Sequence, residues 1–225
     1  MDQACATRDK LLNKIRHYCS LANRPADSVS LLAVSKRQSP AAIRELAACG
    51  QFSFGENYLQ EAEEKISMLS ELDLQWHFIG PLQSNKTSSV ARLFDWVHTL
   101  DREKIARRLD AQRPPELGPL NICLQINISN EDSKNGMTPE KLADMVEIVR
   151  ELPRLKLRGL MALPAPVTDF DQQRQAFRAL RELYERAIGA EIDTLSIGTS
   201  SDYKAAIAEG STMVRIGTAL FGKRT

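Results

Sequence analysis

The chain has 225 residues, of which 43% are hydrophobic and 26% charged, the composition of an ordinary globular protein. With 30 basic and 29 acidic residues the formal net charge is +1, which gives no electrostatic reason to expect nucleic acid or a membrane surface as a partner. The first residues lack the basic-then-apolar layout of a signal peptide, and no apolar run approaches transmembrane length. We therefore expect a cytoplasmic protein, folded as one domain over residues 1–225.

The cysteines are widely scattered along the chain, at Cys5, Cys19, Cys49 and Cys123. None belongs to a C-x-x-C pair or to a spacing typical of metal ligands. For a cytosolic protein this pattern predicts reduced thiols and no metal site.

Taken in chain order, a polar amphipathic segment at about residues 8–22 comes first and predicts a helix. Apolar, β-rich runs then alternate with helical patterns. The expected strands are Val29–Val34, Phe52–Gly55, Leu74–Ile79, Trp96–Leu100, Asn121–Asn127, Leu157–Leu163, Thr194–Gly198 and Met213–Gly217. Expected helices between them include Pro40–Cys49, Asn57–Leu69, Pro139–Glu151, Asp171–Ala187 and Asp202–Glu209.

This alternation indicates βαβ units and a parallel sheet. Eight strands in a chain of this length predict an α/β fold, a (β/α)8 TIM barrel with the first segment as an additional N-terminal helix outside the ring. Because several strands are short, a doubly wound open sheet is the alternative. In a barrel, functional groups gather in the loops where the strands end, including the polar stretch Ser129–Gly136.

Two similar turns lie near the C-terminus, Ile197-Gly198-Thr199 and Ile216-Gly217-Thr218. Each follows an expected strand. Glycine lets the backbone approach a ligand closely, and threonine adds a hydroxyl donor. The pair suggests one phosphate group gripped from two sides.

Lys36 follows the first expected strand and shares a face with Leu32 and Val34, since strand side chains alternate. At a barrel mouth, desolvation would lower the pKa of its amine and expose a nucleophile suited to Schiff-base chemistry. The other interpretation is a lysine that caps the strand and extends to water.

Arg215 lies in the last expected strand, where alternation puts Val214 and Ile216 toward the helices and Arg215 into the barrel. A lone guanidinium there is costly unless it is paired. It is either part of an ion pair with Glu56 or Asp202, or it faces a ligand.

Asn57 and His77 also lie at expected strand ends. Asn57 either caps the following helix or reaches a ligand at the mouth. A single strand histidine is more often a hydrogen-bonded core residue than a catalyst. His17 and His98 show no relation to it in the sequence, so we expect no metal site.

Four segments match a known family: Ala33–Lys36, Phe54–Tyr58, Trp76–Lys86 and Gly210–Gly222. They strongly resemble the pyridoxal phosphate homeostasis proteins over essentially the whole chain. The resemblance implies a barrel of the alanine-racemase N-terminal type that binds pyridoxal 5′-phosphate (PLP).

The resemblance also implies roles for individual residues. Lys36 matches the Schiff-base lysine, and Arg215 matches the arginine that faces the pyridine nitrogen. The phosphate-binding positions fall on Ser200, Gly217 and Thr218, and the positions that line the pocket fall on Asn57 and His77. One departure is Thr199, which stands where the family usually has methionine.

The resemblance implies a role in intracellular PLP (vitamin B6) homeostasis, that is, storing, buffering or delivering the cofactor without established catalytic activity. It also implies a monomer, with apo PLP-dependent enzymes as recipients. An arginine opposite the ring nitrogen agrees with this, because guanidinium is a donor only and stays charged. Racemases of this fold have a further domain, for which we expect no room after Gly222. The alternatives are a PLP-dependent racemase-like enzyme and a cofactor-independent Schiff-base aldolase acting on a sugar phosphate.

Overall fold

The computed structural model describes residues 2–129, 135–187 and 192–222. Its strands are β1 (Ser30–Val34), β2 (Ser53–Glu56), β3 (Gln75–Phe78), β4 (Trp96–Leu100), β5 (Leu120–Ile126), β6 (Leu155–Ala162), β7 (Thr194–Ser196) and β8 (Met213–Ile216). Its helices are α1 (Asp2–Leu21), α2 (Pro40–Ala48), α3 (Leu59–Met68), α4 (Thr87–Leu93), α5 (Glu103–Gln112), α6 (Leu142–Arg150), α7 (Phe170–Ala187), α8 (Tyr203–Ala208) and α9 (Thr218–Phe221).

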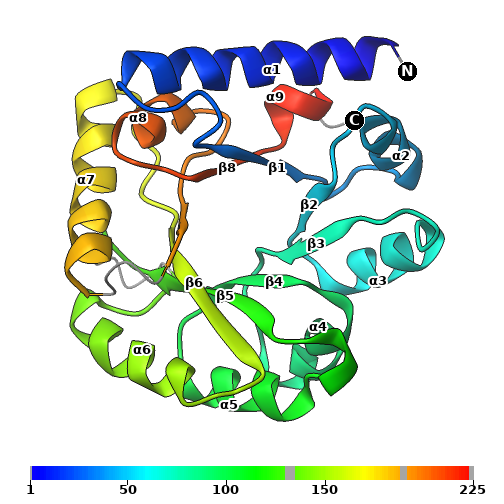
Figure 1. Cartoon of the computed structure of the whole chain (residues 1–225), viewed down its shortest axis with the longest axis vertical. Helices are drawn as coiled ribbons and strands as arrows, with labels where there is room; N and C mark the ends of the chain where they lie inside the picture. The colour runs from blue at the N-terminus through cyan, green and yellow to red at the C-terminus, as the bar shows by residue number, and fades with distance from the viewer. Residues whose placement is uncertain (1, 130–134, 188–191, 223–225) are drawn as a thin grey trace.

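The strands form one closed barrel in chain order, from β1 to β8. All strand pairs are parallel, and the ring closes where β8 pairs with β1, with Leu32 opposite Arg215. Closure confirms the predicted (β/α)8 barrel, because a doubly wound sheet would keep two edge strands. Figure 1 shows the strands around the centre and the helices outside them.

Alternation along the strands divides the side chains between two environments. Leu31, Ala33, Val214 and Ile216 belong to the main apolar core between strands and helices. Residues of the opposite parity face the inside of the barrel, where Trp96, Cys123 and Met161 form a small separate cluster. The barrel interior also contains buried polar side chains, among them Arg215, His98 and Ser196.

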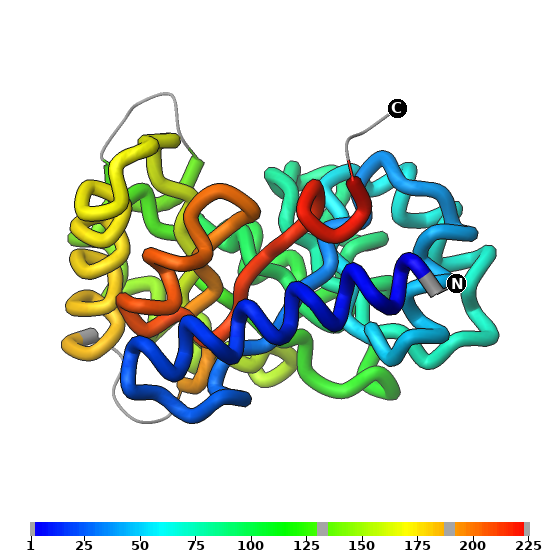
Figure 2. Tube along the Cα trace, turned by 90° about the horizontal axis from the view of Figure 1, so that it is seen from above, coloured from blue at the N-terminus to red at the C-terminus, as the bar shows by residue number. Residues whose placement is uncertain are grey.

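Helix α1 is the predicted additional helix outside the ring. It contacts α2, α8 and α9, and Figure 2 shows it running along one side of the molecule past α8 and α9. Its buried residues Leu11, Ile15 and Cys19 recur every four positions, so one stripe of the helix packs on the core. The helix begins at Asp2, six residues before the predicted start at residue 8.

The expectation of four reduced cysteines is wrong for two of them. Cys5 and Cys49 form a disulfide that ties α1 to the end of α2, across 44 residues of sequence. The packing of α1 beside α2 brings their Cα atoms to 5.2 Å, a proximity that linear spacing cannot reveal. Cys19 and Cys123 are buried thiols.

Most predicted element ends differ from the observed ones by one to three residues. The seventh strand, for example, ends at Ser196 rather than Gly198, because Gly198 has a φ of +95°, which an extended strand cannot accommodate. Helices α4, α5 and α9 lie outside the patterns recognised in the sequence. Within the described ranges, no helix is both long and apolar enough to cross a membrane.

Candidate functional site

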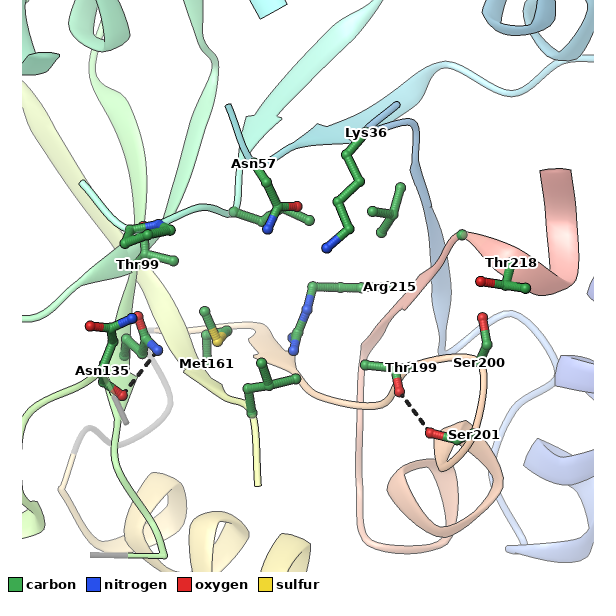
Figure 3. Close-up of a pocket in the computed structure, with 16 residues that line it drawn as sticks. Lys36, Asn57, Thr99, Asn135, Met161, Thr199, Ser200, Ser201, Arg215 and Thr218 are labelled. Atoms are coloured by element: carbon green, nitrogen blue, oxygen red, sulfur yellow. Dashed lines mark hydrogen bonds between the residues drawn. The ribbon is translucent and has the colours of Figure 1, made fainter. Parts of the chain in front are cut away.

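A cavity of about 470 Å³ opens at the C-terminal ends of the barrel strands. Residues at the end of every strand or in the loop after it contribute to its lining, and Figure 3 shows many of them converging on it. This is the face where TIM-barrel sites form, and the volume suits a small cofactor.

The structure brings six of the seven predicted site residues to this cavity: Lys36, Asn57, Ser200, Arg215, Gly217 and Thr218. The seventh, His77, is fully buried and does not line it. The two Gly-Thr turns, from the loops after β7 and β8, also meet there, because Thr199 lines the same cavity.

Lys36 comes directly after β1, two positions beyond Val34, and both side chains line the cavity. Figure 3 shows its amine pointing into the cavity toward the Arg215 guanidinium, with Asn57 beside it. The lysine therefore lies at the barrel mouth, as the strand alternation predicts.

Arg215 is 6% exposed and points inward from β8, as predicted. Its Nη1 donates to the Ser196 carbonyl and, at 2.9 Å, to the Ser196 hydroxyl, while Nη2 donates to the Ala162 carbonyl at 3.0 Å. Among the described residues it forms no ion pair, and Glu56 pairs with Lys65 instead. Burial lowers the pKa of Arg215 to about 10, so the group remains a cation near neutral pH.

A chain of buried polar groups continues from Arg215 through the barrel interior. The Ser196 hydroxyl lies 2.9 Å from His98 Nδ1, His98 Nε2 lies 2.9 Å from His77 Nδ1, and His77 Nε2 lies 3.0 Å from Gln75 Oε1. Because the guanidinium can only donate, the chain is satisfied when each group donates to the next and both histidines are neutral. Burial lowers the pKa of His77 to about 3. Burial, His77 and Arg215 together lower the pKa of His98 well below its ordinary value.

The phosphate end of the predicted site consists of Ser200, Gly217 and Thr218. The amide of Ala219 donates to the Ser200 hydroxyl at 3.4 Å, which joins the two loops. A Cβ on Gly217 would lie 3.1 Å from the Val34 carbonyl, so a larger residue would crowd this turn. Figure 3 shows the Ser200 and Thr218 hydroxyls close together on one side of the cavity.

The two Gly-Thr turns are not equivalent. Gly198 has a φ of +95°, whereas Gly217 has a φ of −111°. The Thr199 amide and hydroxyl both donate to Asp202 Oδ1, at 2.6 and 2.8 Å. The Thr199 hydroxyl therefore donates its hydrogen to Asp202, at the start of α8, and not to a group in the cavity.

Asn57 Oδ1 is buried and, among the described residues, has no hydrogen-bond partner. The backbone around it is tightly packed, because a Cβ on Gly80 would lie 1.9 Å from the Asn57 carbonyl oxygen. A buried polar atom without a partner is costly in a closed core and typical of a site that a ligand completes.

Several lining residues were not predicted from the sequence. Thr99 donates to the Gly80 carbonyl at 2.6 Å, and Gln125 donates to the Asn135 carbonyl at 3.1 Å. Gln125 could have been found from the sequence, because it is a polar residue near the end of the apolar run that forms β5. Asn135 belongs to the predicted polar loop, of which residues 130–134 lie outside the described part of the chain.

Comparison with known proteins agrees with this geometry. The family model described as alanine racemase, N-terminal domain, matches residues 9–225. The pyridoxal phosphate homeostasis protein of Pseudomonas aeruginosa is 54% identical over 215 residues, covering 96% of this chain and 93% of that protein. The protein of the same name from Escherichia coli K12 is 52% identical over 222 residues, covering 94% of this chain and 93% of that protein.

Among solved structures, PipY of Synechococcus elongatus PCC7942 with PLP bound has a TM-score of 0.77 and 39% identity, covering 92% of this chain and 100% of that chain. Alanine racemase from E. faecalis has a TM-score of 0.70 at 16% identity, covering 98% of this chain and 58% of that chain, and shares the fold. The chain therefore belongs to the pyridoxal phosphate homeostasis protein family, whose barrel is of the alanine-racemase N-terminal type.

Proposed function

We propose that this chain binds PLP as a Schiff base on Lys36 and takes part in intracellular PLP homeostasis, by storing, buffering or delivering the cofactor. The two relatives with the homeostasis name described above are 54% and 52% identical to the chain over nearly its whole length. A more distant relative has been solved with PLP bound.

The observation that carries this proposal is the arrangement of three kinds of group around one cavity. Lys36 supplies an amine, Arg215 a fixed cationic donor, and Ser200 and Thr218 two hydroxyls. PLP supplies an aldehyde, a ring nitrogen and a phosphate, which have the complementary chemistry. The residues present therefore fit the cofactor. Asn57 lines the same cavity, and its buried Oδ1, which has no hydrogen-bond partner among the described residues, would be available to the ligand.

Arg215 also supports a carrier over an enzyme. A guanidinium donates hydrogen bonds and keeps its proton, and neutral groups hold this one on its other side. It can orient the ring nitrogen but is a poor source of the proton that strong electron withdrawal by the ring requires. We therefore propose no catalytic turnover of amino acids, and a cytoplasmic monomer of one domain whose partners are apo PLP-dependent enzymes.

Absorbance spectroscopy tests the attachment. Purified protein mixed with PLP should gain the visible-range absorbance of a protein Schiff base, and borohydride reduction should fix the cofactor on Lys36 in a peptide map. Lys36→Ala should lose both signals, while Lys10→Ala, at an exposed position on α1, should keep them. A colourless wild-type protein that PLP cannot reconstitute would contradict the proposal and favour the aldolase.

Function is tested by cofactor transfer. Loaded protein should activate an apo-enzyme in the presence of a scavenger that removes unbound PLP, whereas an equal amount of PLP alone should not. Incubation of the loaded protein with single-enantiomer amino acids in D2O tests for catalysis instead. Exchange of the α-proton at ordinary enzymatic rates would establish the racemase-like alternative.

A further inference from the structure

We propose that Lys65 is a positioning residue for Lys36, acting with Glu56 and Glu61 as a clamp on the backbone that carries the Schiff-base lysine. This inference rests on the proposed function. The clamp is built on α3 and β2 and lies outside the group of residues that line the cavity.

The Lys65 ammonium is buried, with 4% of its side chain exposed. Its Nζ donates to the Ser35 carbonyl at 2.7 Å, to Glu56 Oε1 at 2.7 Å and to Glu61 Oε1 at 2.6 Å. An ammonium has three donors, so all of them are used. This lysine is therefore occupied as a structural cation and is not a second site for an aldehyde.

The same three side chains hold the residues on both sides of Lys36. Before it, Ser35 accepts from Lys65 through its carbonyl and donates from its hydroxyl to Glu56 Oε1 at 2.6 Å. After it, the Arg37 amide donates to Glu61 Oε1. One network thus fixes the peptide groups before and after the lysine and, with them, the direction of its side chain.

The backbone here needs such support. Arg37 has a φ of +61°, in the left-handed region that a residue with a side chain rarely adopts. The Gln38 amide closes a tight turn by donating to the Ser35 carbonyl at 3.0 Å. Strained backbone of this kind persists only where its surroundings hold it, and the contact from Glu61 to the Arg37 amide falls on the strained residue itself.

Charge explains why the three side chains act together. Glu56 is fully buried; burial raises its pKa, and Lys65 and then Ser35 oppose this rise. Its second oxygen, Oε2, is buried with no hydrogen-bond partner among the described residues. Without Lys65 the Glu56 carboxylate would lack a neighbouring cation, so removing the lysine should disturb both neighbours of Lys36 at once.

Glu61 gives the cleanest test, because its side chain is 25% exposed and its removal leaves the buried pair intact. Glu61→Ala removes the acceptor for the Arg37 amide. Glu61→Gln keeps an oxygen at that position. Glu64→Ala is the matched control, since Glu64 is an exposed residue of the same type on the same helix.

The first measurement compares PLP with pyridoxine 5′-phosphate, which has the ring and phosphate but no aldehyde. Glu61→Ala should slow Schiff-base formation by about 10- to 100-fold, the range expected when a reacting group is misplaced. Affinity for pyridoxine 5′-phosphate should change by less than about twofold, since positioning affects the covalent step alone. Glu61→Gln should recover most of the rate, and Glu64→Ala should match the wild-type protein. The proposal would be overturned if Glu61→Ala lowered the affinity for pyridoxine 5′-phosphate by as large a factor as it lowered the rate of Schiff-base formation with PLP. An unchanged rate of Schiff-base formation in Glu61→Ala would overturn it as well.

The second measurement needs no PLP. Brief labelling of the ligand-free protein with an amine-reactive reagent, read by peptide mapping, reports the accessibility and basicity of Lys36. Glu61→Ala and Lys65→Met should change labelling at Lys36 and leave labelling at Lys10 unaltered. If wild-type protein fails to bind PLP but this change occurs, the proposed function fails and the clamp stands. If PLP binds normally and labelling does not change in either variant, the clamp fails.

Discussion

The two cationic groups of the cavity are supported in opposite ways. At Lys36 an ionic network of Lys65, Glu56 and Glu61 holds the backbone on both sides of the residue. At Arg215 the guanidinium itself is held, and its partners are carbonyl groups, a hydroxyl and, beyond them, two histidines.

The difference follows from what each group has to do in the proposed function. A lysine that forms and breaks a covalent bond needs a fixed backbone to direct its side chain, and its amine has to remain reactive. An arginine that orients a ring nitrogen needs a fixed head, and neutral partners hold it without forming an ion pair that would compete with the ligand. The Lys36 region should therefore respond to loss of charge, and the Arg215 region to loss of neutrality.

Lys65→Met should have the largest effect on stability. It leaves the Glu56 carboxylate buried without its cation, which typically costs about 3–5 kcal/mol. Urea unfolding measures the loss. The double variant Glu56→Gln/Lys65→Met should recover much of it, because the buried charge is then removed, and a double variant as unstable as Lys65→Met would contradict the ionic account of this region.

Acid should weaken the Arg215 region through its histidines. Burial lowers the pKa of His77 in the folded protein to about 3, from the ordinary value of 6.5, so between these pH values the unfolded chain binds more protons. The contribution of a neutral His77 to stability is therefore fully present above about pH 6.5 and is lost as the pH drops toward 3. At pH 5 the loss from this one residue is about 2 kcal/mol.

The measurement is the free energy of unfolding between pH 7 and pH 5. His77→Gln should reduce its slope with pH, since an amide does not titrate. His17→Gln, at an exposed position on α1, is the control for the replacement of a histidine by glutamine. If His77→Gln also leaves it unchanged, His77 is not held neutral in the fold.

Ser196→Ala should produce a smaller loss in the same region. The hydroxyl accepts from Arg215 and contacts His98 Nδ1, so its removal leaves two buried groups short of a partner. The expected cost is about 1–2 kcal/mol, because the Ser196 carbonyl still holds the guanidinium. Urea unfolding and PLP titration should both detect the loss. If Ser196→Ala changes neither the stability nor the PLP affinity, the carbonyl groups alone fix Arg215.

The fold and the inward direction of Lys36 and Arg215 could be predicted because strand alternation acts locally. Their places toward the ends of their strands then put both at the barrel mouth. The roles of Ser200, Gly217 and Thr218, by contrast, were expected from the family resemblance.

The residues that hold Lys36 and Arg215 in place could not be predicted in this way, because they come from elements far apart in the sequence. Lys65 lies on α3, and its contacts with Ser35 and Glu56 depend on how that helix packs beside β1 and β2. The expectation that His98 has no relation to His77 is wrong, because the register of β3 with β4 brings the two rings together. The disulfide between Cys5 and Cys49 likewise depends on how α1 packs.

The smallest predicted effect separates the two Gly-Thr turns. Thr199→Val should cost about 0.5–1 kcal/mol, since it removes the hydroxyl that donates to Asp202 Oδ1 at 2.8 Å. It should leave PLP affinity unchanged, because that hydrogen is directed to Asp202. Thr218→Val, in the turn that matches the phosphate grip, should weaken PLP binding by about tenfold through loss of a donor to a charged group. Comparable losses of affinity in the two variants would mean that both turns contact the phosphate, and that Thr199 exchanges Asp202 for the ligand when PLP binds.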